Sequence, residues 1–531
     1  MKNFFLILVI LFWSNSQTIF GQMKRPITAS KPTVAAQLLP KKSEIMVNNS
    51  LLIQFLKKYP DFKKYQASVA DLYKKRNYKP IWFQNNRLID LAPHLHAKLN
   101  TVDEEGITTQ IPHKEAIEAI FSKEDLQPKP SKTESELLLS VAYIWYAKKV
   151  FQGLDTKIIK EMGWLLPRKE ISYSNLLKSL LVRPELLDRN DQLVFRQYYK
   201  LKSYLKKYKE IEKNGGWSSI PVDSLSLSFK PQDNSPIIGQ IRERLTVFGD
   251  LEKDSKSTIY DKELEIGMEN FKKRNGFTLD NLIEARHIMR MNIPIEDYIA
   301  NICINMERCR WIEPSLTQAD AYIFVNIPSY KLIFKRKDTT ALESNVVVGE
   351  TLTETAIFSG LIDRLVFSPF WNIPRNIIKN EIEQSMANDK EYLANHNMEW
   401  NNGNIRQKPG PQNPMGLVKF IFPNSNEIYL HDTPSKSLFK SEYRAYSHGC
   451  INVNKAQELA YIVLQNDPEW PAERITKAMS GEKETTCILK NKIPVHIGYF
   501  TALVTDSGKI NFYYDVYERD ECLKPLLAGD N

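Results

Sequence analysis

Residues 322–336, YIFVNIPSYKLIFKR, alternate apolar with polar side chains and are rich in β-branched and aromatic residues. A period of two predicts β-strands rather than helices. SNVVVGE (344–350) follows after a polar turn, as expected for a hairpin. The same pattern recurs in LVFSPFWNIP (365–374), LVKFIFPNSNEIYLHDT (417–433) and HIGYFTALVTDSGKINFYYDVY (496–517). We therefore expect a mainly β domain over residues 315–520.

One polar, partly helical segment interrupts this domain. It reads NEIEQSMANDKEYLANHNMEWNNGN and spans residues 380–404. A long insertion beside a site often serves as a lid. A solvated surface excursion explains the same composition equally well, and both interpretations stay open here.

The preceding half of the chain has the helical period instead. LLLSVAYIWYAKKVF (137–151) places Leu138, Val141, Ala142 and Trp145 on one face, which predicts a single buried stripe. We expect a helical scaffold domain at 46–215. Two short amphipathic helices within 225–295 predict a small second helical domain, and a further helix is expected at 296–311. The predicted fold class is thus multidomain α+β.

The length and the composition of the chain indicate several folded domains. A chain of 531 residues is too long for one hydrophobic core, and its 42% apolar and 25% charged residues are ordinary globular usage. The net charge of +9 favours an anionic partner such as cell wall, a membrane surface or nucleic acid. We expect no nucleic-acid partner, because no zinc-finger spacing or interleaved basic and aromatic motif is present.

The N-terminus has the layout of an export signal. Lys2 precedes the apolar run FFLILVILFW (4–13), and a polar stretch leads to the small residue Gly21. We predict a signal peptide at 1–21 with cleavage and a linker at 22–45, although an uncleaved anchor is the alternative. No later apolar run approaches membrane length, so no stable span is expected after cleavage.

Cysteine usage then has to suit an oxidising compartment. The five cysteines are an odd and sparse set, so at least one thiol should be free. Whether Cys303 pairs with Cys309, or Cys487 with Cys522, is not decided by the sequence. Cys450 is the thiol that needs an explanation.

Cys450 lies in RAYSHGCINVNKAQELAYIV (444–463), in a turn that we expect to stand immediately before a helix capped by Asn452 or Asn454. A helix N-terminus and a neighbouring imidazole both favour a thiolate. The backbone amides around His448, Gly449 and Cys450 would then face an oxyanion.

His431, in EIYLHDTPSK (427–436), is the preferred base, because it is far enough upstream to lie on a neighbouring strand. The backbone carbonyl of Asp432 is a plausible acceptor for its other ring nitrogen. A buried structural cysteine and histidine would look the same in sequence. A zinc site from His431, His448 and Cys450 lacks a clear fourth ligand, so we predict no metal.

These two segments resemble the signature of the L,D-transpeptidases, which have a YkuD-type catalytic domain, and in particular its larger multidomain YcbB-like branch. The resemblance extends to MERCRWIEP (306–314), NVVVGE (345–350) and SPFWNIPRNII (368–378), and it covers residues from about 300 to 520. The helical scaffold at 46–215 and a peptidoglycan-binding-like domain at 225–295 match more loosely.

The resemblance implies roles for individual residues. Cys450 would be the nucleophile, His431 its base and the Asp432 carbonyl the orienting group, while Tyr429 and the Gly449 backbone would border the oxyanion site. The substrate groove would be lined by Arg444, His448, Trp371, Asn372 and Asn452. Arg444 has the clearest chemical reason, because a guanidinium binds the carboxylates of peptide stems in a bidentate manner.

The implied activity is 3→3 cross-linking of peptidoglycan tetrapeptide stems through a Cys450 thioester, without a cofactor. Carbapenems would acylate the same thiol. Water as acceptor would make the enzyme an L,D-carboxypeptidase. A papain-like thiol hydrolase would place its cysteine before its histidine, and a non-catalytic wall scaffold would not need both residues. The expected location is the periplasm, with peptidoglycan stems and other cell-wall synthesis proteins as partners.

Overall fold

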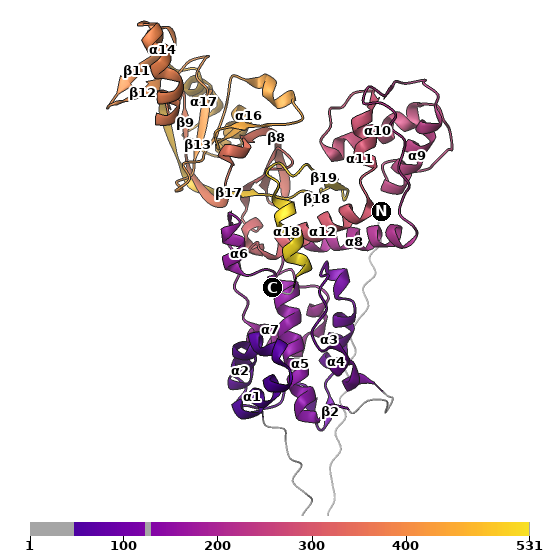
Figure 1. Ribbon diagram of the computed structural model, residues 1–531. Helices are drawn as coiled ribbons and strands as arrows, with labels where there is room; N and C mark the ends of the chain where they lie inside the picture. Colours follow the sequence, from indigo (N-terminus) through magenta and orange to yellow (C-terminus); the bar gives the residue numbers. More distant parts are fainter. Residues whose placement is uncertain (1–46, 123–128, 530–531) are drawn as a thin grey trace, which may run out of the picture. The chain divides into compact units, whose positions relative to one another are not determined.

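The computed structural model describes residues 47–122 and 129–529 (Figure 1). The predicted signal peptide at 1–21 and linker at 22–45 lie outside these residues. The predicted fold class is confirmed, because a helical N-terminal region is followed by a mainly β C-terminal domain. No helix in the described ranges is long and apolar enough to cross a membrane.

The first region is helical, as predicted. Short 3₁₀ and π turns connect its helices, which are α1 (Asn49–Lys58), α2 (Gln66–Lys74), α3 (Leu91–Asn100), α4 (Lys114–Phe121), α5 (Lys132–Ala147), α6 (Thr156–Glu161), α7 (Tyr173–Val182) and α8 (Gln197–Lys213). Its strands are very short: β1 (Phe83–Gln84) and β2 (Arg87–Leu88) form a hairpin, and β3 is Trp164–Leu165.

Helix α5 is the centre of this region. It begins at a capping box in which Ser131 accepts from the Glu134 amide and the Glu134 side chain accepts from the Ser131 amide. Every residue from Ser135 to Ala147 is buried. The predicted single stripe was therefore too narrow: helices α1 to α4 contact α5 and cover it on several sides.

The second region contains two longer helices and a short one. They are α9 (Pro236–Phe248), α10 (Lys262–Asn275) and α11 (Ala285–Met291), with β4 (Ser228–Phe229) paired to β5 (Ile283–Glu284). Helices α9 and α10 end at Gly249 and Gly276, whose φ angles of 80° and 77° suit glycine best. Helix α12 (Ile295–Arg310) then leads into the β domain.

The β domain is a sheet closed into a ring. Its strands are β6 (Ala321–Asn326), β7 (Lys331–Arg336), β8 (Thr339–Gly349), β9 (Ile357–Phe367), β13 (Val418–Ile421), β14 (Leu430–His431), β16 (Ile451–Val453) and β17 (Thr485–Gly498). Pairing follows the order β13, β14, β16, β8, β7, β6, β17, β9 and returns from β9 to β13. This closure leaves no free edge within the ring.

Further elements lie outside that ring. Strand β15 (Ala445–Ser447) pairs with β8, β3 from the helical region pairs with β9, and β18 (Ala502–Val504) pairs with β19 (Ile510–Phe512). The helices of this domain are α16 (Ala456–Leu464), α17 (Ala472–Met479) and α18 (Arg519–Ala528).

The segment predicted as an insertion belongs to a unit that has its own small core. Strands β10 (Trp371–Asn372), β12 (Asn404–Gln407) and β11 (Met398–Asn401) form a separate sheet, and short helical turns between Arg375 and Asn395 cover it. This core consists of buried isoleucines, namely Ile373, Ile377, Ile378, Ile382 and Ile405. Residues 380–404 are thus part of a larger packed unit spanning 371–407.

Three buried histidines make the fold sensitive to acid. Burial lowers the pKa of His287, His431 and His496 from 6.5 to about 4. These histidines contribute their full stability when the pH is above their pKa in the unfolded chain. That stability is lost as the pH falls towards their lower pKa in the folded protein. Between these two pKa values, each histidine lowers the free energy of unfolding by about 1.4 kcal/mol for every pH unit of acidification.

We therefore expect the melting temperature to fall between pH 6.5 and pH 5, before most carboxylates titrate. Calorimetry at a series of pH values measures this slope. His496→Gln should reduce the slope by removing one titrating group. A melting temperature that stays constant over this window would contradict the assignment.

Candidate active site

The register of the strands places the candidate site residues on one face of the sheet. In the parallel pair β14–β16, Leu430 lies opposite Ile451 and His431 opposite Asn452. The Ile451 amide donates to the Tyr429 carbonyl at 3.1 Å, so Cys450 lies level with Tyr429. Because side chains alternate along a strand, Tyr429 and His431 share a face, and their rings are 5.6 Å apart. His431 is therefore a diagonal neighbour of Cys450.

The opposite faces of these strands are apolar and buried. Val418, Phe420, Leu430, Ile451 and Val453 are all buried in the main core. This alternation fixes which side chains face the site, because a slip of one residue would exchange the two faces.

The predicted contact between His431 and Asp432 is present. His431 Nδ1 lies 2.5 Å from the Asp432 carbonyl oxygen. A carbonyl can only accept, so Nδ1 carries the proton and Nε2 is left with a lone pair. Asp432 is itself held, because its carboxylate accepts from the Leu417 amide at 3.0 Å and from Lys436 Nζ at 2.6 Å.

The surroundings of His431 favour the neutral imidazole. Burial lowers its pKa to about 4, and the charge of Lys419 acts in the same direction. The carbonyl of Asp432 opposes this effect, as does the nearby carbonyl of Pro414. A neutral imidazole at physiological pH is a competent proton acceptor.

The Cys450 thiol contacts Tyr429 and Glu427. Its Sγ lies 3.7 Å from the Glu427 carbonyl oxygen. Burial raises the pKa of the thiol, whereas hydrogen bonds from the Tyr429 amide and hydroxyl and the charge of Lys419 lower it. The structure shows no hydrogen bond between Cys450 and His431 within the described ranges. Burial favours the neutral form of each of these two groups, which lie on one face of the sheet.

The expectation of a helix directly after Cys450 was wrong. Strand β16 follows it, and the first residue of helix α16 is Ala456. The reason is that Ile451 and Val453 are β-branched and apolar, and they pair with β14 and β8. Lys455, rather than Asn452 or Asn454, occupies the cap position of α16. The helix dipole thus does not act on the thiol.

Hydrogen bonds of the turn before Cys450 hold its backbone. Gly449 has a φ of 105°, and its amide donates to Ser447 Oγ at 3.2 Å. Ser447 Oγ donates in turn to the Cys450 carbonyl at 2.5 Å, and Thr355 Oγ1 donates to the Gly449 carbonyl at 2.9 Å. The Gly449 amide is therefore engaged inside the turn, whereas the Cys450 amide has no partner among the described residues.

The residues predicted to line the groove have different environments. Asn452 is on the same face as His431, and His448 is exposed. Asn372 is exposed in β10, where Trp371 packs against the isoleucine core of the 371–407 unit. Arg444 donates to the carbonyls of Phe439 and Ser441, and its guanidinium lies 5.1 Å from the Tyr330 ring centre.

Sequence reasoning missed Lys419, which lies opposite His431 in the register of β13 and β14. Its Nζ is 5.6 Å from the ring centre of Tyr429 and donates to the Phe370 carbonyl at 3.3 Å. A signal was present in LVKFIF (417–422), where one lysine interrupts an apolar strand. Thr355 and Ser447, which hold the turn, gave no comparable signal.

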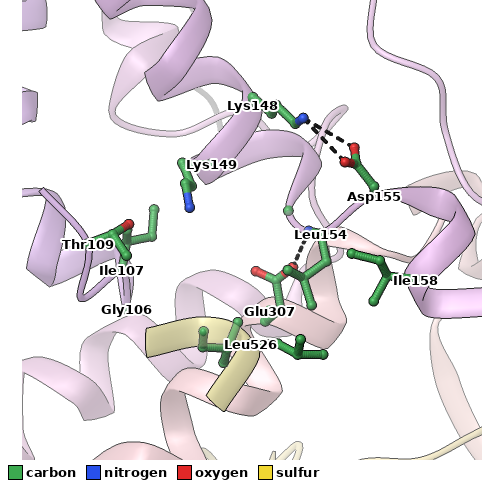
Figure 2. Close-up of a pocket in the computed structure, with 12 residues that line it drawn as sticks. Gly106, Ile107, Thr109, Lys148, Lys149, Leu154, Asp155, Ile158, Glu307 and Leu526 are labelled. Carbon is green, nitrogen blue, oxygen red and sulfur yellow. Dashed lines mark hydrogen bonds and ion pairs between the residues drawn. The ribbon is translucent and has the colours of Figure 1, made fainter. Parts of the chain in front are cut away.

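A small cavity lies between the helical region and helices α12 and α18. It is lined by Gly106, Lys149, Leu154 and Glu307 among others, and its volume is about 40 Å³ (Figure 2). That volume suits about three water molecules. Within residues 47–122 and 129–529, no group of three His, Cys, Asp or Glu side chains is placed to hold a metal ion. All five cysteines are unpaired.

Comparisons with known proteins match two parts of the chain to known domains. The profile of the YkuD family, described as the L,D-transpeptidase catalytic domain, matches residues 320–475, and that of the Scaffold domain matches residues 67–205. A Haemophilus influenzae protein named "Putative L,D-transpeptidase" is 33% identical over 219 residues. The match covers 37% of this chain and 44% of that relative, so it spans less than half of the relative's length.

Two solved structures are also similar to this chain. The L,D-transpeptidase from Mycobacterium smegmatis has 12% identity and a TM-score of 0.20, covering 34% of this chain and 59% of its own. The L,D-transpeptidase (Yku) from Stackebrandtia nassauensis has 12% identity and a TM-score of 0.21, covering 52% and 97%. Both TM-scores are too low to support an argument. By its sequence profiles and its curated relative, the chain is a multidomain protein that contains a YkuD-type L,D-transpeptidase catalytic domain and a Scaffold domain.

Proposed function

We propose that the protein is a peptidoglycan L,D-transpeptidase that forms 3→3 cross-links through a thioester on Cys450. The observation that supports this most directly is the shared sheet face of Cys450, Tyr429 and His431, inside the segment that matches the catalytic domain. The substrates would be tetrapeptide stems and the location the cell envelope. Arg444, His448, Trp371, Asn372 and Asn452 stay as proposed groove residues.

In the first step Cys450 Sγ attacks the carbonyl carbon of the third stem residue. His431 Nε2 accepts the thiol proton as the S–C bond forms, since this nitrogen is unprotonated in the resting enzyme. Both groups are neutral before substrate binds, so charge is created only as the reaction proceeds. The imidazolium that forms is stabilised by the Asp432 carbonyl.

The tetrahedral intermediate needs donors for its oxyanion. We assign the Cys450 amide to this task, with the Tyr429 hydroxyl bordering the oxyanion site, because the Gly449 amide already donates to Ser447. Gly449 instead gives the turn its left-handed backbone conformation. Collapse of the intermediate breaks the C–N bond, and the terminal D-Ala amine leaves with the proton from His431.

In the second step a side-chain amine of another stem attacks the thioester carbonyl and loses its proton to His431. The Cys450 sulfur leaves and is reprotonated. Water in place of the amine would give an L,D-carboxypeptidase. A tetrapeptide assay with and without an amine acceptor, analysed by mass spectrometry, distinguishes the two products.

Acylation by a carbapenem tests the nucleophile. We expect one drug-sized mass increase on the folded protein and none on Cys450→Ala, because the strained lactam carbonyl is an acyl donor. Cys522→Ala is the matched control: it removes an exposed thiol and should acylate as fast as the parent. An adduct that persists on Cys450→Ala, or is absent from the folded parent, would contradict the proposal.

The pH dependence of acylation tests the base. The imidazole accepts a proton only when neutral, and burial lowers its pKa to about 4. The acylation rate should therefore fall on the acid side with a midpoint near pH 4 to 5 rather than 6.5, as measured by single-turnover kinetics. A midpoint at the value of a solvated imidazole would show that His431 is not buried as described, or is not the base.

Substitution of Gly416 tests the support of His431. Gly416 has a φ of +57°, and a Cβ atom there would lie 2.5 Å from Asp432 Oδ2. Gly416→Ala should therefore displace Asp432, lower stability by about 1–3 kcal/mol and slow acylation at least tenfold. Denaturant unfolding and acylation rates measure the two effects.

Gly508→Ala provides the matched control for that variant. Gly508 also has a positive φ, +80°, but a Cβ atom there meets nothing within 4 Å. It should lose stability through backbone strain of about 1 kcal/mol without slowing acylation. Equal acylation rates in the two variants would show that Asp432 does not orient the base.

A further inference from the structure

We propose that Lys419 is a positioning residue that stabilises negative charge on Cys450 Sγ and disfavours protonation of the neighbouring His431. This inference rests on the proposed function for its biological meaning. The test of the inference is independent of that function, because thiol ionisation can be measured without any peptidoglycan substrate.

The backbone directs Lys419 to this face. Lys419 pairs with His431 across the antiparallel strands β13 and β14, and Val418 and Phe420 on either side of it are buried in the core. Paired residues in an antiparallel ladder project their side chains to the same side of the sheet. Lys419 therefore stands beside the strand that carries Tyr429 and His431.

Two contacts hold the ammonium group over the site. Lys419 Nζ lies 5.6 Å from the Tyr429 ring centre and donates to the Phe370 carbonyl at 3.3 Å. The Tyr429 hydroxyl is near enough to the Cys450 sulfur to lower the pKa of the thiol. The cation, the phenol and the thiol thus form one contiguous group.

The charge of Lys419 is not neutralised locally. No carboxylate of the described chain lies within 4.0 Å of its Nζ, in contrast to Lys436, which pairs with Asp432 at 2.6 Å. The Glu484 carboxylate is the nearest acidic influence, and it accepts from the Phe370 amide at 2.9 Å. A lysine with so few partners is left to interact with charge that appears on Cys450.

The electrostatic effects agree with this geometry. Burial lowers the pKa of Lys419, while Glu484 and a Cys450 thiolate raise it. The groups that act on the thiol are Tyr429, Lys419 and, in the opposite direction, Glu427. Asp432 and Lys419 act in opposite directions on His431. Removing the lysine charge should therefore raise the pKa of both the thiol and the imidazole.

The expected rise in both pKa values distinguishes an electrostatic role of Lys419 from a structural one. A thiol that merely loses its packing would become more solvated, and its pKa would fall towards the usual value. Loss of a cation shifts both groups upwards instead. An opposite charge nearby typically changes a pKa by about one unit or more.

The test is the pH profile of Cys450 alkylation by iodoacetamide, followed by intact mass in a Cys522→Ala background. For Lys419→Met we expect the alkylation midpoint to rise by about one unit, with alkylation about tenfold slower at pH 7. The acid midpoint of carbapenem acylation should rise in the same variant. Lys419→Arg retains the charge and should restore both midpoints.

Lys331→Met is the matched charge control. Lys331 lies on β7, elsewhere in the ring, and pairs with Glu343 at 2.8 Å. It removes one positive charge from the same domain and should leave both midpoints unchanged. If Lys331→Met shifts both midpoints as much as Lys419→Met does, the loss of net charge would be responsible rather than the position of Lys419.

Two outcomes would overturn the inference. An unchanged alkylation profile in Lys419→Met, combined with a raised KM for a tetrapeptide, would assign the lysine to a substrate carboxylate instead. Should Lys419→Met fail to fold, a folded Lys419→Arg whose midpoints differ from the parent would equally contradict it. Failure of the transpeptidase assay with a shifted alkylation profile would reject the proposed function alone.

Discussion

The pairing of β14 with its two neighbours is the constraint on which the site depends. The antiparallel partner β13 supplies Lys419, and the parallel partner β16 begins directly after Cys450. Because the opposite faces of all three strands are buried in the core, their register cannot slip without exposing apolar side chains. The hydrophobic core therefore determines the relative positions of Cys450, His431 and Lys419.

The sequence predicts the fold class, and it singles out candidate site residues, because both leave local signals. Alternation predicts the strands, and Cys450 and His431 stand out by residue type. The strand after Cys450 was missed because Ile451 and Val453 are too few to form a recognisable period. Pairing with β14 and β8 stabilises that short strand, and such long-range contacts cannot be derived from local sequence.

Long-range contacts that the local sequence does not reveal also explain the other differences between the predictions and the structure. The complete burial of α5 depends on neighbours that surround it in space, whereas its sequence shows only one stripe. The engagement of the Gly449 amide depends on Ser447 and Thr355, two small residues without a motif. Lys419 could have been suspected as a charge within an apolar strand, but its partner His431 became evident only from the register.

Burial of the site favours the uncharged forms of both Cys450 and His431 at rest. An ionised thiolate or imidazolium would each lose solvation on burial, and the pKa directions of Cys450 and His431 show that both avoid it. In the proposed mechanism, proton transfer creates two charges at once, and each needs a partner that is already in place. The Asp432 carbonyl faces the imidazole, and the Tyr429 hydroxyl contacts the sulfur. The strand register therefore places the compensating groups before any charge forms.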